Sequence, residues 1–191
     1  MENLTVFCRM IRARTQENRA AMHLIGTSNL AGPMVGILRQ ELDSMIRVIY
    51  LLCISDNNRR TALIEDSIRG LEWMEEPPNQ KRRITDREMV NLANGLQGWS
   101  KNVYKFGCAF VHLSRFHDYL CLDPMSAIEP AERGEVAYYM NYYHGTHFDS
   151  DLSFSDIVPY LPAVFEKISS NLECYLKELE DEKVLSEYNA A

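Results

Sequence analysis

The feature that most constrains this chain is a nearly uninterrupted apolar stretch before residue 55. Polar positions are sparse from Met34 to Ile54, and only Arg47 carries a charge between Met45 and Ile54. A helix that is apolar nearly all round has to be surrounded by other helices. Its longest apolar run, Val48 to Ile54, falls well short of the ~18 residues that a membrane-spanning helix needs. The sequence therefore predicts a central buried helix over about residues 34–55, and no membrane association.

The positions of glycine, proline and capping residues predict the other helices. Thr85 with Glu88 three residues later forms a capping box, which starts one of them. Segments of alternating polarity, which would build a sheet, are absent from the sequence. Further helices are expected over about residues 2–25, 57–75, 100–122 and 155–182, and residues 130–143 can form a helix or a strand. We predict an all-α fold, a single-domain helical bundle of five to seven helices that spans residues 1–191.

Cysteine usage and the N-terminal residues indicate a cytoplasmic protein. The five cysteines are far apart and form no Cys-x-x-Cys pair, as is typical of reduced, buried thiols. Charged residues interrupt the stretch from Met1 to Arg19, where a signal peptide would be apolar. Residues 116–191 contain four basic and fifteen acidic side chains, whereas the preceding residues are mildly basic. That basic part leaves nucleic-acid binding open as a hypothesis.

Two groups of polar residues are predicted to meet in one pocket. Arg39, Asp43 and Arg47 recur every four residues on the apolar helix, so they share one face. On the helix predicted over residues 100–122, His112 and Arg115 lie on a stripe beside the apolar face, together with Tyr104, Cys108 and Tyr119. An imidazole beside guanidinium groups can bind an anion and transfer a proton. The alternative is an internal network of ion pairs that fixes the register of the helices.

A second candidate site is the loop after residue 143. Two histidines and two aspartates lie within eight residues and offer ligands for a divalent cation: His144, His147, Asp149 and Asp151. Their spacing matches no established metal motif, and a solvated loop that caps the next helix is the alternative.

A third candidate is a tyrosine-rich segment that contains Tyr138, Tyr139, Tyr142 and Tyr143. Tyrosines combine a large apolar area with a polar tip, and they are frequent at protein interfaces. If the segment is helical, the spacing of four residues makes an aromatic ridge. The ridge is predicted either to bind a protein partner or a second copy of the chain, or to cover the core.

Part of the chain, about residues 35–120, resembles bacterial helical proteins allied to the HEPN superfamily. The resemblance rests on Arg39-x-x-x-Asp43 on the apolar helix, followed by Tyr104 and the run Phe110–Ser114. It implies an α-helical, often dimeric protein, in a superfamily with many metal-independent RNases. The catalytic signature of that superfamily is an Arg followed after four to six residues by a His. No Arg precedes His112 at that distance, and only Phe116 separates Arg115 from His117.

Sequence motifs for common cofactors and reactions are absent. The chain contains no Gly-x-x-x-x-Gly-Lys, Gly-x-Gly-x-x-Gly, His-Glu-x-x-His or Gly-x-Ser-x-Gly motif, and we predict no cofactor. The preferred function is a non-catalytic interaction or regulatory module. The alternative is a HEPN-like metal-independent RNase, or another small hydrolytic enzyme, that uses His112 with Arg115, Arg39 and Asp43.

Overall fold

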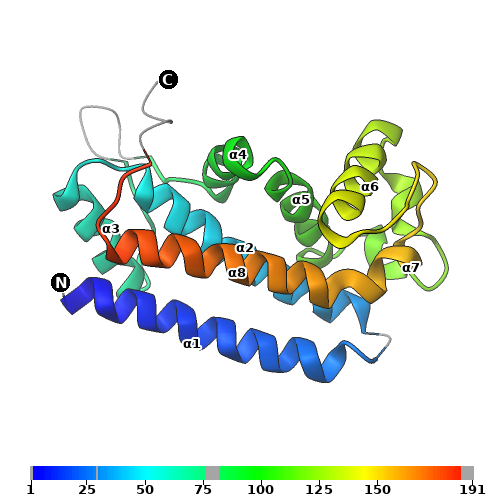
Figure 1. Ribbon diagram of the computed structural model, residues 1–191, viewed down its shortest axis with the longest axis horizontal. Helices are drawn as coiled ribbons and strands as arrows, with labels where there is room; N and C mark the ends of the chain where they lie inside the picture. The colour runs from blue at the N-terminus through cyan, green and yellow to red at the C-terminus, as the bar shows by residue number, and fades with distance from the viewer. Residues whose placement is uncertain (1, 29, 76–81, 186–191) are drawn as a thin grey trace. The chain divides into compact units, whose positions relative to one another are not determined.

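The computed structural model describes residues 2–28, 30–75 and 82–185. Over these residues the chain is mainly helical and has no β-strand apart from one isolated bridge between Met74 and Arg83. The described helices of twelve or more residues number seven (Figure 1): α1 (Glu2–Ile25), α2 (Ala31–Leu52), α3 (Asn57–Ile68), α4 (Asp86–Gln97), α5 (Ser100–Val111), α6 (Pro130–His144) and α8 (Leu161–Glu180). A four-residue turn, α7 (Phe154–Ile157), precedes α8. The predicted all-α bundle is confirmed.

The chain divides into two compact units. The first contains residues 1–17, 43–98 and 169–191, and the second contains residues 18–42 and 99–168. Helices α1, α2 and α8 contribute residues to both units. In the described parts of the chain, no helix is both long and apolar enough to cross a membrane.

Helix α2 is buried over most of its length, as the apolar stretch predicted. Met34, Leu42 and Met45 are fully buried, and so are most of the apolar residues from Ile46 to Leu52. The helix begins at Ala31 rather than after Pro33. Pro33 is accommodated because the first-turn N–H groups have no intrahelical partner, so a missing one costs little.

Helices α1 and α8 run antiparallel and are joined by ion pairs within each unit (Figure 1). In the first unit, Arg12 binds Glu173 at 3.0 Å and Glu180 at 2.6 Å. In the second unit, Arg19 binds Glu166 at 2.9 Å. These side chains are partly exposed, so the pairs mainly align two helices that pack through their apolar faces.

Helix α3 is shorter than predicted, since it ends at Ile68 instead of continuing to residue 75. Gly70 adopts a φ of 69°, and Leu71 N donates to Asp66 O, which closes the helix end. Trp73 therefore lies outside the helix, where it is buried and donates from Nε1 to Ser67 Oγ at 2.9 Å. Trp73 is part of the core although it lies outside α3. Its apolar side chain therefore extended the apparent helical spacing and made the predicted helix too long.

The largest correction concerns the helix predicted over residues 100–122, which ends at Val111. Ser114 turns the chain: its hydroxyl donates to Ala109 O and accepts from Phe116 N. The Nε2 atom of His117 lies 3.1 Å from Phe110 O and can only donate to that carbonyl. Both side chains thus satisfy carbonyl groups that a continuing helix would have used.

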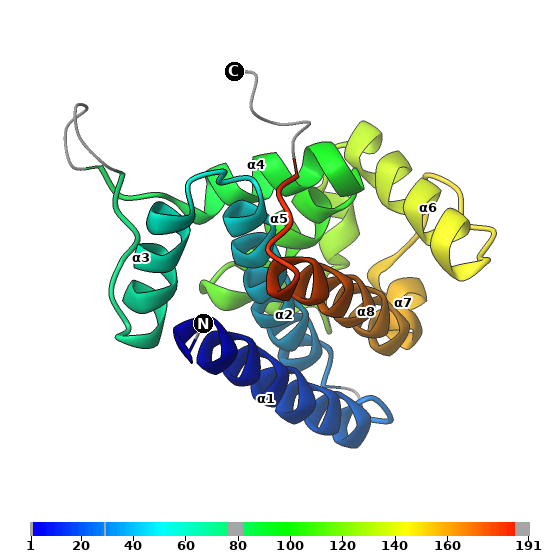
Figure 2. The same ribbon diagram turned by 60° about the vertical axis from the view of Figure 1, so that its left-hand side comes forward.

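The last third of the chain folds into helices, as the first alternative for residues 130–143 predicted. Helix α6 spans Pro130–His144. It lies beside α5 (Figure 2). Asn102 and Lys105 of α5 contact Glu135 and Glu132 of α6, so the two helices run antiparallel. Ser153 forms a capping box with Asp156 at the start of α7.

The prediction of buried cysteines is only partly correct. Cys8 is buried, and burial is the main cause that raises the pKa of its thiol to about 12. Cys121 and Cys174 are exposed. Cys121 was expected on the apolar helix that the turn at Ser114 interrupts, which explains its exposure.

Candidate functional site

Two residues of the predicted pocket, His112 and Arg115, lie beyond the end of α5. His112 and Arg115 are both exposed. The Arg115 guanidinium donates to Ala127 O at 3.5 Å, and His112 N donates to Cys108 O. The stripe predicted to join Tyr104 to His112 and Arg115 is therefore not one helix face, because the helix ends before these residues.

Arg39 of α2 packs against α5 within the second unit. Its guanidinium carbon lies 4.4 Å from the centroid of the Tyr104 ring. Gly107 makes this approach possible, since a Cβ atom there would lie 2.8 Å from the Cβ of Arg39. The side chain of Arg39 thus lies along α5 in a close, cation–π contact.

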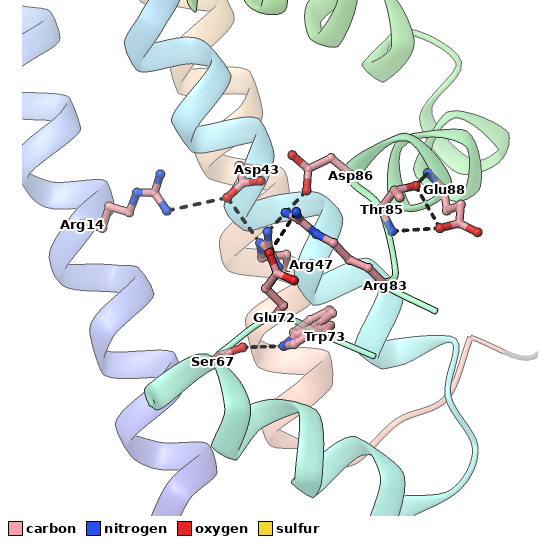
Figure 3. A network of polar contacts seen from close by, with 10 residues as sticks. All are labelled: Arg14, Asp43, Arg47, Ser67, Glu72, Trp73, Arg83, Thr85, Asp86 and Glu88. Carbon is pink, nitrogen blue, oxygen red and sulfur yellow. Dashed lines mark hydrogen bonds and ion pairs between the residues drawn. The ribbon is translucent and has the colours of Figure 1, made fainter. Parts of the chain in front are cut away.

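Asp43 and Arg47 belong to the first unit and form a polar network there (Figure 3). Arg47 binds Asp43 one helical turn away at 3.3 Å and Asp86 of α4 at 3.3 Å. Asp43 also lies 3.9 Å from Arg14 of α1. The guanidinium of Arg47 stacks over the Trp73 ring at 5.2 Å.

Further contacts extend this Arg47 network toward the loop before α4. Arg83 binds Glu72 at 2.9 Å, and Thr85 and Glu88 form the predicted capping box (Figure 3). Paired charges connect α1, α2 and α4, and the contact between Arg47 and Trp73 adds the segment after α3. For Asp43 and Arg47, this arrangement agrees with the alternative prediction of an internal network of ion pairs that fixes the register of the helices.

The predicted metal loop is organised by an amide instead of a cation. Asn141 Oδ1 accepts from Phe148 N and Thr146 Oγ1, and its Nδ2 donates to Phe148 O. Gly145, with a φ of 65°, ends α6 at this point.

The four predicted ligands do not converge. Among the residues that the structure describes, no three His, Cys, Asp or Glu side chains are grouped to hold a metal. The structure thus does not bring His144, His147, Asp149 and Asp151 together as a ligand set. Asp149 instead accepts from Asp151 N, as a turn-forming aspartate does.

The four tyrosines of α6 form two stacked pairs with different surroundings. Tyr138 and Tyr142 stack at 6.2 Å between centroids, and their side chains are 60% and 69% exposed. Tyr139 and Tyr143 stack at 6.3 Å and line a pocket in the second unit. The sequence left open whether this segment binds a partner or covers the core. In the structure, Tyr139 and Tyr143 line the pocket, whereas Tyr138 and Tyr142 are exposed to solvent.

The pocket beside Tyr139 and Tyr143 has a volume of about 110 Å³ and is lined mainly by apolar side chains from α2, α5, α6 and α8. Trp99 and Lys167 also line it, and neither was identified from the sequence. A lone Lys on a helix and a Trp next to a glycine carry no motif that would have marked them.

A second feature that the sequence analysis missed is a short segment with several exposed apolar side chains. We call it the leucine segment (Val111–Leu122). Leu113 is 94% exposed and Leu120 is 85% exposed, while Val111 and Leu122 are also largely in solvent. In a helix that continued to residue 122, the helical period would place Leu113 and Leu120 on its apolar face. The turn at Ser114 removes that periodicity and leaves them outward.

Comparisons with known proteins identify no relative. The chain matches no family model, no curated protein and no solved structure. The functional argument therefore rests on the geometry of its own residues.

Proposed function

We propose that this chain is a non-catalytic interaction module that associates with a second copy of itself through the leucine segment. The observation that carries this proposal is the exposure of Leu113 and Leu120 on a segment held in a defined conformation. Exposed apolar groups are common singly, whereas several gathered in one short segment are typical of interaction sites.

The leucine segment is anchored at several points, which distinguishes it from a loose loop. Phe116 packs edge-to-face on Phe106 at 5.6 Å and on Phe110 at 5.9 Å. Tyr119 contacts Phe154 at 5.7 Å. Just after the segment, Asp123 accepts from Phe154 N at 2.9 Å. The anchored aromatic residues hold the leucines outward, so association would require little additional ordering.

The charges of the leucine segment suit a second copy of the same surface. Arg115 and Asp118 are both exposed and have opposite signs. In a two-fold symmetric dimer the same surface meets itself, so each of these charges can approach its opposite on the other copy. Apolar contacts between the leucines would supply the driving force.

The exposed tyrosine pair supports the same function from another surface. Tyr138 and Tyr142 present two stacked rings to solvent on one face of α6. Tyrosine is enriched at interfaces because its ring is rigid and its hydroxyl tolerates water. We propose this pair as an additional contact, and we exclude Tyr139 and Tyr143 from it because they line the pocket.

The experiment measures mass in solution by light scattering and sedimentation velocity over a series of protein concentrations. We expect the wild-type chain to form a dimer and a variant with Leu113→Ser and Leu120→Ser to be monomeric. The matched control is Leu24→Ser on α1, because Leu24 is 76% exposed but lies outside the segment. The control should remain a dimer, and circular dichroism should show all three proteins equally helical.

Two results would overturn the proposal. One is a wild-type chain that stays monomeric at the highest concentration reached. The other is a double variant with the same dimerisation constant as the wild type. Replacing Tyr138 and Tyr142 by Ser tests the second surface, and it should weaken association without altering the helical content.

The ribonuclease alternative has no comparable support in the geometry. It assigns proton transfer to His112, whose side chain is exposed after the end of α5. Arg39 contacts Tyr104, and Asp43 pairs with Arg47. We therefore retain the interaction module as the proposed function.

A further inference from the structure

The pocket of the second unit has apolar walls and a small set of polar groups. Its walls include Leu38 of α2, Phe106 of α5, Val136 of α6 and Ile168 of α8. An apolar cavity of about 150 Å³ can hold a benzene ring, so a pocket of this order fits a compact ring or part of an acyl chain. The four helices that supply the walls make the site part of the folded unit.

The buried indole of Trp99 forms part of the wall of this pocket. Its side chain is 5% exposed, and Nε1 has no hydrogen-bond partner at normal geometry among the described residues. Buried donors in proteins are nearly always paired with the protein, with water or with a ligand. A pocket with mainly apolar walls offers water few partners, which favours a ligand with an acceptor atom.

Tyr143 lies next to Trp99 and provides a second donor. Burial is the main cause that raises the pKa of the Tyr143 phenol, and a polar contact between the Tyr143 hydroxyl and the Trp99 side chain partly opposes this rise. The phenol is therefore protonated at neutral pH and can donate.

Lys167 supplies a positive charge to the same end of the pocket. Its Nζ atom lies 4.5 Å from the centroid of the Tyr143 ring. Burial, followed by the charge of Lys167, lowers the pKa of His144, so that the imidazole is neutral at neutral pH. No carboxylate is among the described residues that line the pocket, so the charge of Lys167 is not balanced from the pocket wall.

We propose that this pocket binds a small carboxylic acid with a compact apolar body. The apolar body lies between Leu38, Phe106 and Val136, and the carboxylate pairs with Lys167, beside the indole of Trp99. The site is independent of the leucine segment and of self-association.

The primary experiment is calorimetric titration of the full chain with two probes, 3-phenylpropionate and octanoate, each compared with its neutral amide. We expect at least one acid to bind in a saturable way and to bind about tenfold more tightly than its amide, because a charge-assisted hydrogen bond is stronger than a neutral one. Saturable binding of neither acid would overturn the proposal. So would equal affinity for an acid and its amide.

Substitutions locate the binding site. Lys167→Met keeps the length of the side chain and should weaken acid binding about tenfold while changing amide binding little. The matched control is Lys177→Met, an exposed lysine on the same helix that does not line the pocket, and it should bind as the wild type does. Unchanged acid binding by the Lys167 variant would refute the assigned contact.

A second pair of variants keeps the test valid if the lysine variant folds poorly. Trp99→Phe removes the N–H donor but keeps an aromatic ring, and it should weaken both acid and amide. Val164→Phe fills the pocket and should abolish binding of both probes with the helical content retained. Binding that survives a correctly folded Val164→Phe variant would show that the probes bind elsewhere, and the proposal would fail.

Discussion

A cation that lies over an aromatic ring has different partners in the two units. In the first unit, Arg47 is paired with two carboxylates and stacked on Trp73. In the second unit, Trp99 Nε1 is buried without a partner of normal geometry among the described residues, and Lys167 faces an apolar pocket. The comparison teaches that a cation paired with carboxylates stabilises the fold of its own unit. A cation beside a pocket without a lining carboxylate is instead available to bind an anionic ligand.

The apolar side chains show the same contrast. In the first unit, Leu63 is fully buried and Trp73 is only 2% exposed. The second unit holds Phe116 and Tyr119 in an aromatic cluster but leaves Leu113 and Leu120 in solvent. The residues that could mediate association therefore gather in the second unit, beside elements that are themselves well packed.

The largest effect is expected from breaking the Arg47 network. Arg47→Met should lower the free energy of unfolding by about 2–3 kcal/mol, because Asp43 and Asp86 lose the cation that they share and Trp73 loses the guanidinium above its ring. Urea unfolding followed by tryptophan fluorescence measures the change. Arg9→Met, at an exposed position on α1, should change the same quantity by less than about 0.5 kcal/mol. Equal effects of the two substitutions would mean that the network contributes nothing specific.

A smaller effect tests whether the second unit depends on close packing. Gly107→Ala should destabilise the protein by about 1–2 kcal/mol, because the added Cβ would lie 2.8 Å from the Cβ of Arg39. Gly134→Ala is the matched control in α6, where a Cβ would have no neighbour within 4 Å. That substitution should stabilise the helix by about 0.5–1 kcal/mol. Thermal unfolding of both variants compares the signs, and stabilisation by Gly107→Ala would contradict the packing described.

The smallest effect concerns the pH dependence of the first unit. The backbone hydrogen bond from Thr85, followed by the side chain of Arg82, lowers the pKa of Glu88 below its ordinary value of 4.5. Stability from this carboxylate is therefore present above pH 4.5 and is lost as the pH falls through the lowered pKa. Because Glu88 is partly exposed and screened, we expect Glu88→Gln to remove less than about 1 kcal/mol of this pH-dependent stability.

The measurement is urea unfolding at a series of pH values from neutral to below pH 4.5. The control is Glu129→Gln, since Glu129 begins α6 without a side-chain cap. The control should keep the wild-type pH profile. A Glu88→Gln variant whose profile also stays unchanged would show that the capping box contributes nothing measurable.

Local sequence signals predicted most helices well because their causes are local. The capping box of Thr85 and Glu88 depends on residues three positions apart, and it was confirmed. The apolar run of α2 predicted its burial because no other position in a bundle removes so much apolar surface from water. The helix of the tyrosine segment was one of two alternatives that composition could not separate.

The errors arose where a side chain had two possible partners. Ser114 and His117 could have continued α5, but they bind the carbonyl groups of Ala109 and Phe110 and end it. The predicted pocket around His112 depended on that helix continuing. Asp43 and Arg47 were correctly placed on one helix face, but their partners Asp86 and Arg14 are far away in the sequence.

The sequence by itself determined the all-α class, the buried central helix and the capped helix starts, because these follow from the periodicity and capping of neighbouring residues. Only the tertiary structure decided which charges pair, which leucines face solvent and that Trp99, Tyr143 and Lys167 border one pocket. The physical reason is that hydrogen bonds and packing between distant segments depend on chain reversals, and a single turn such as that at Ser114 redirects every side chain that follows it.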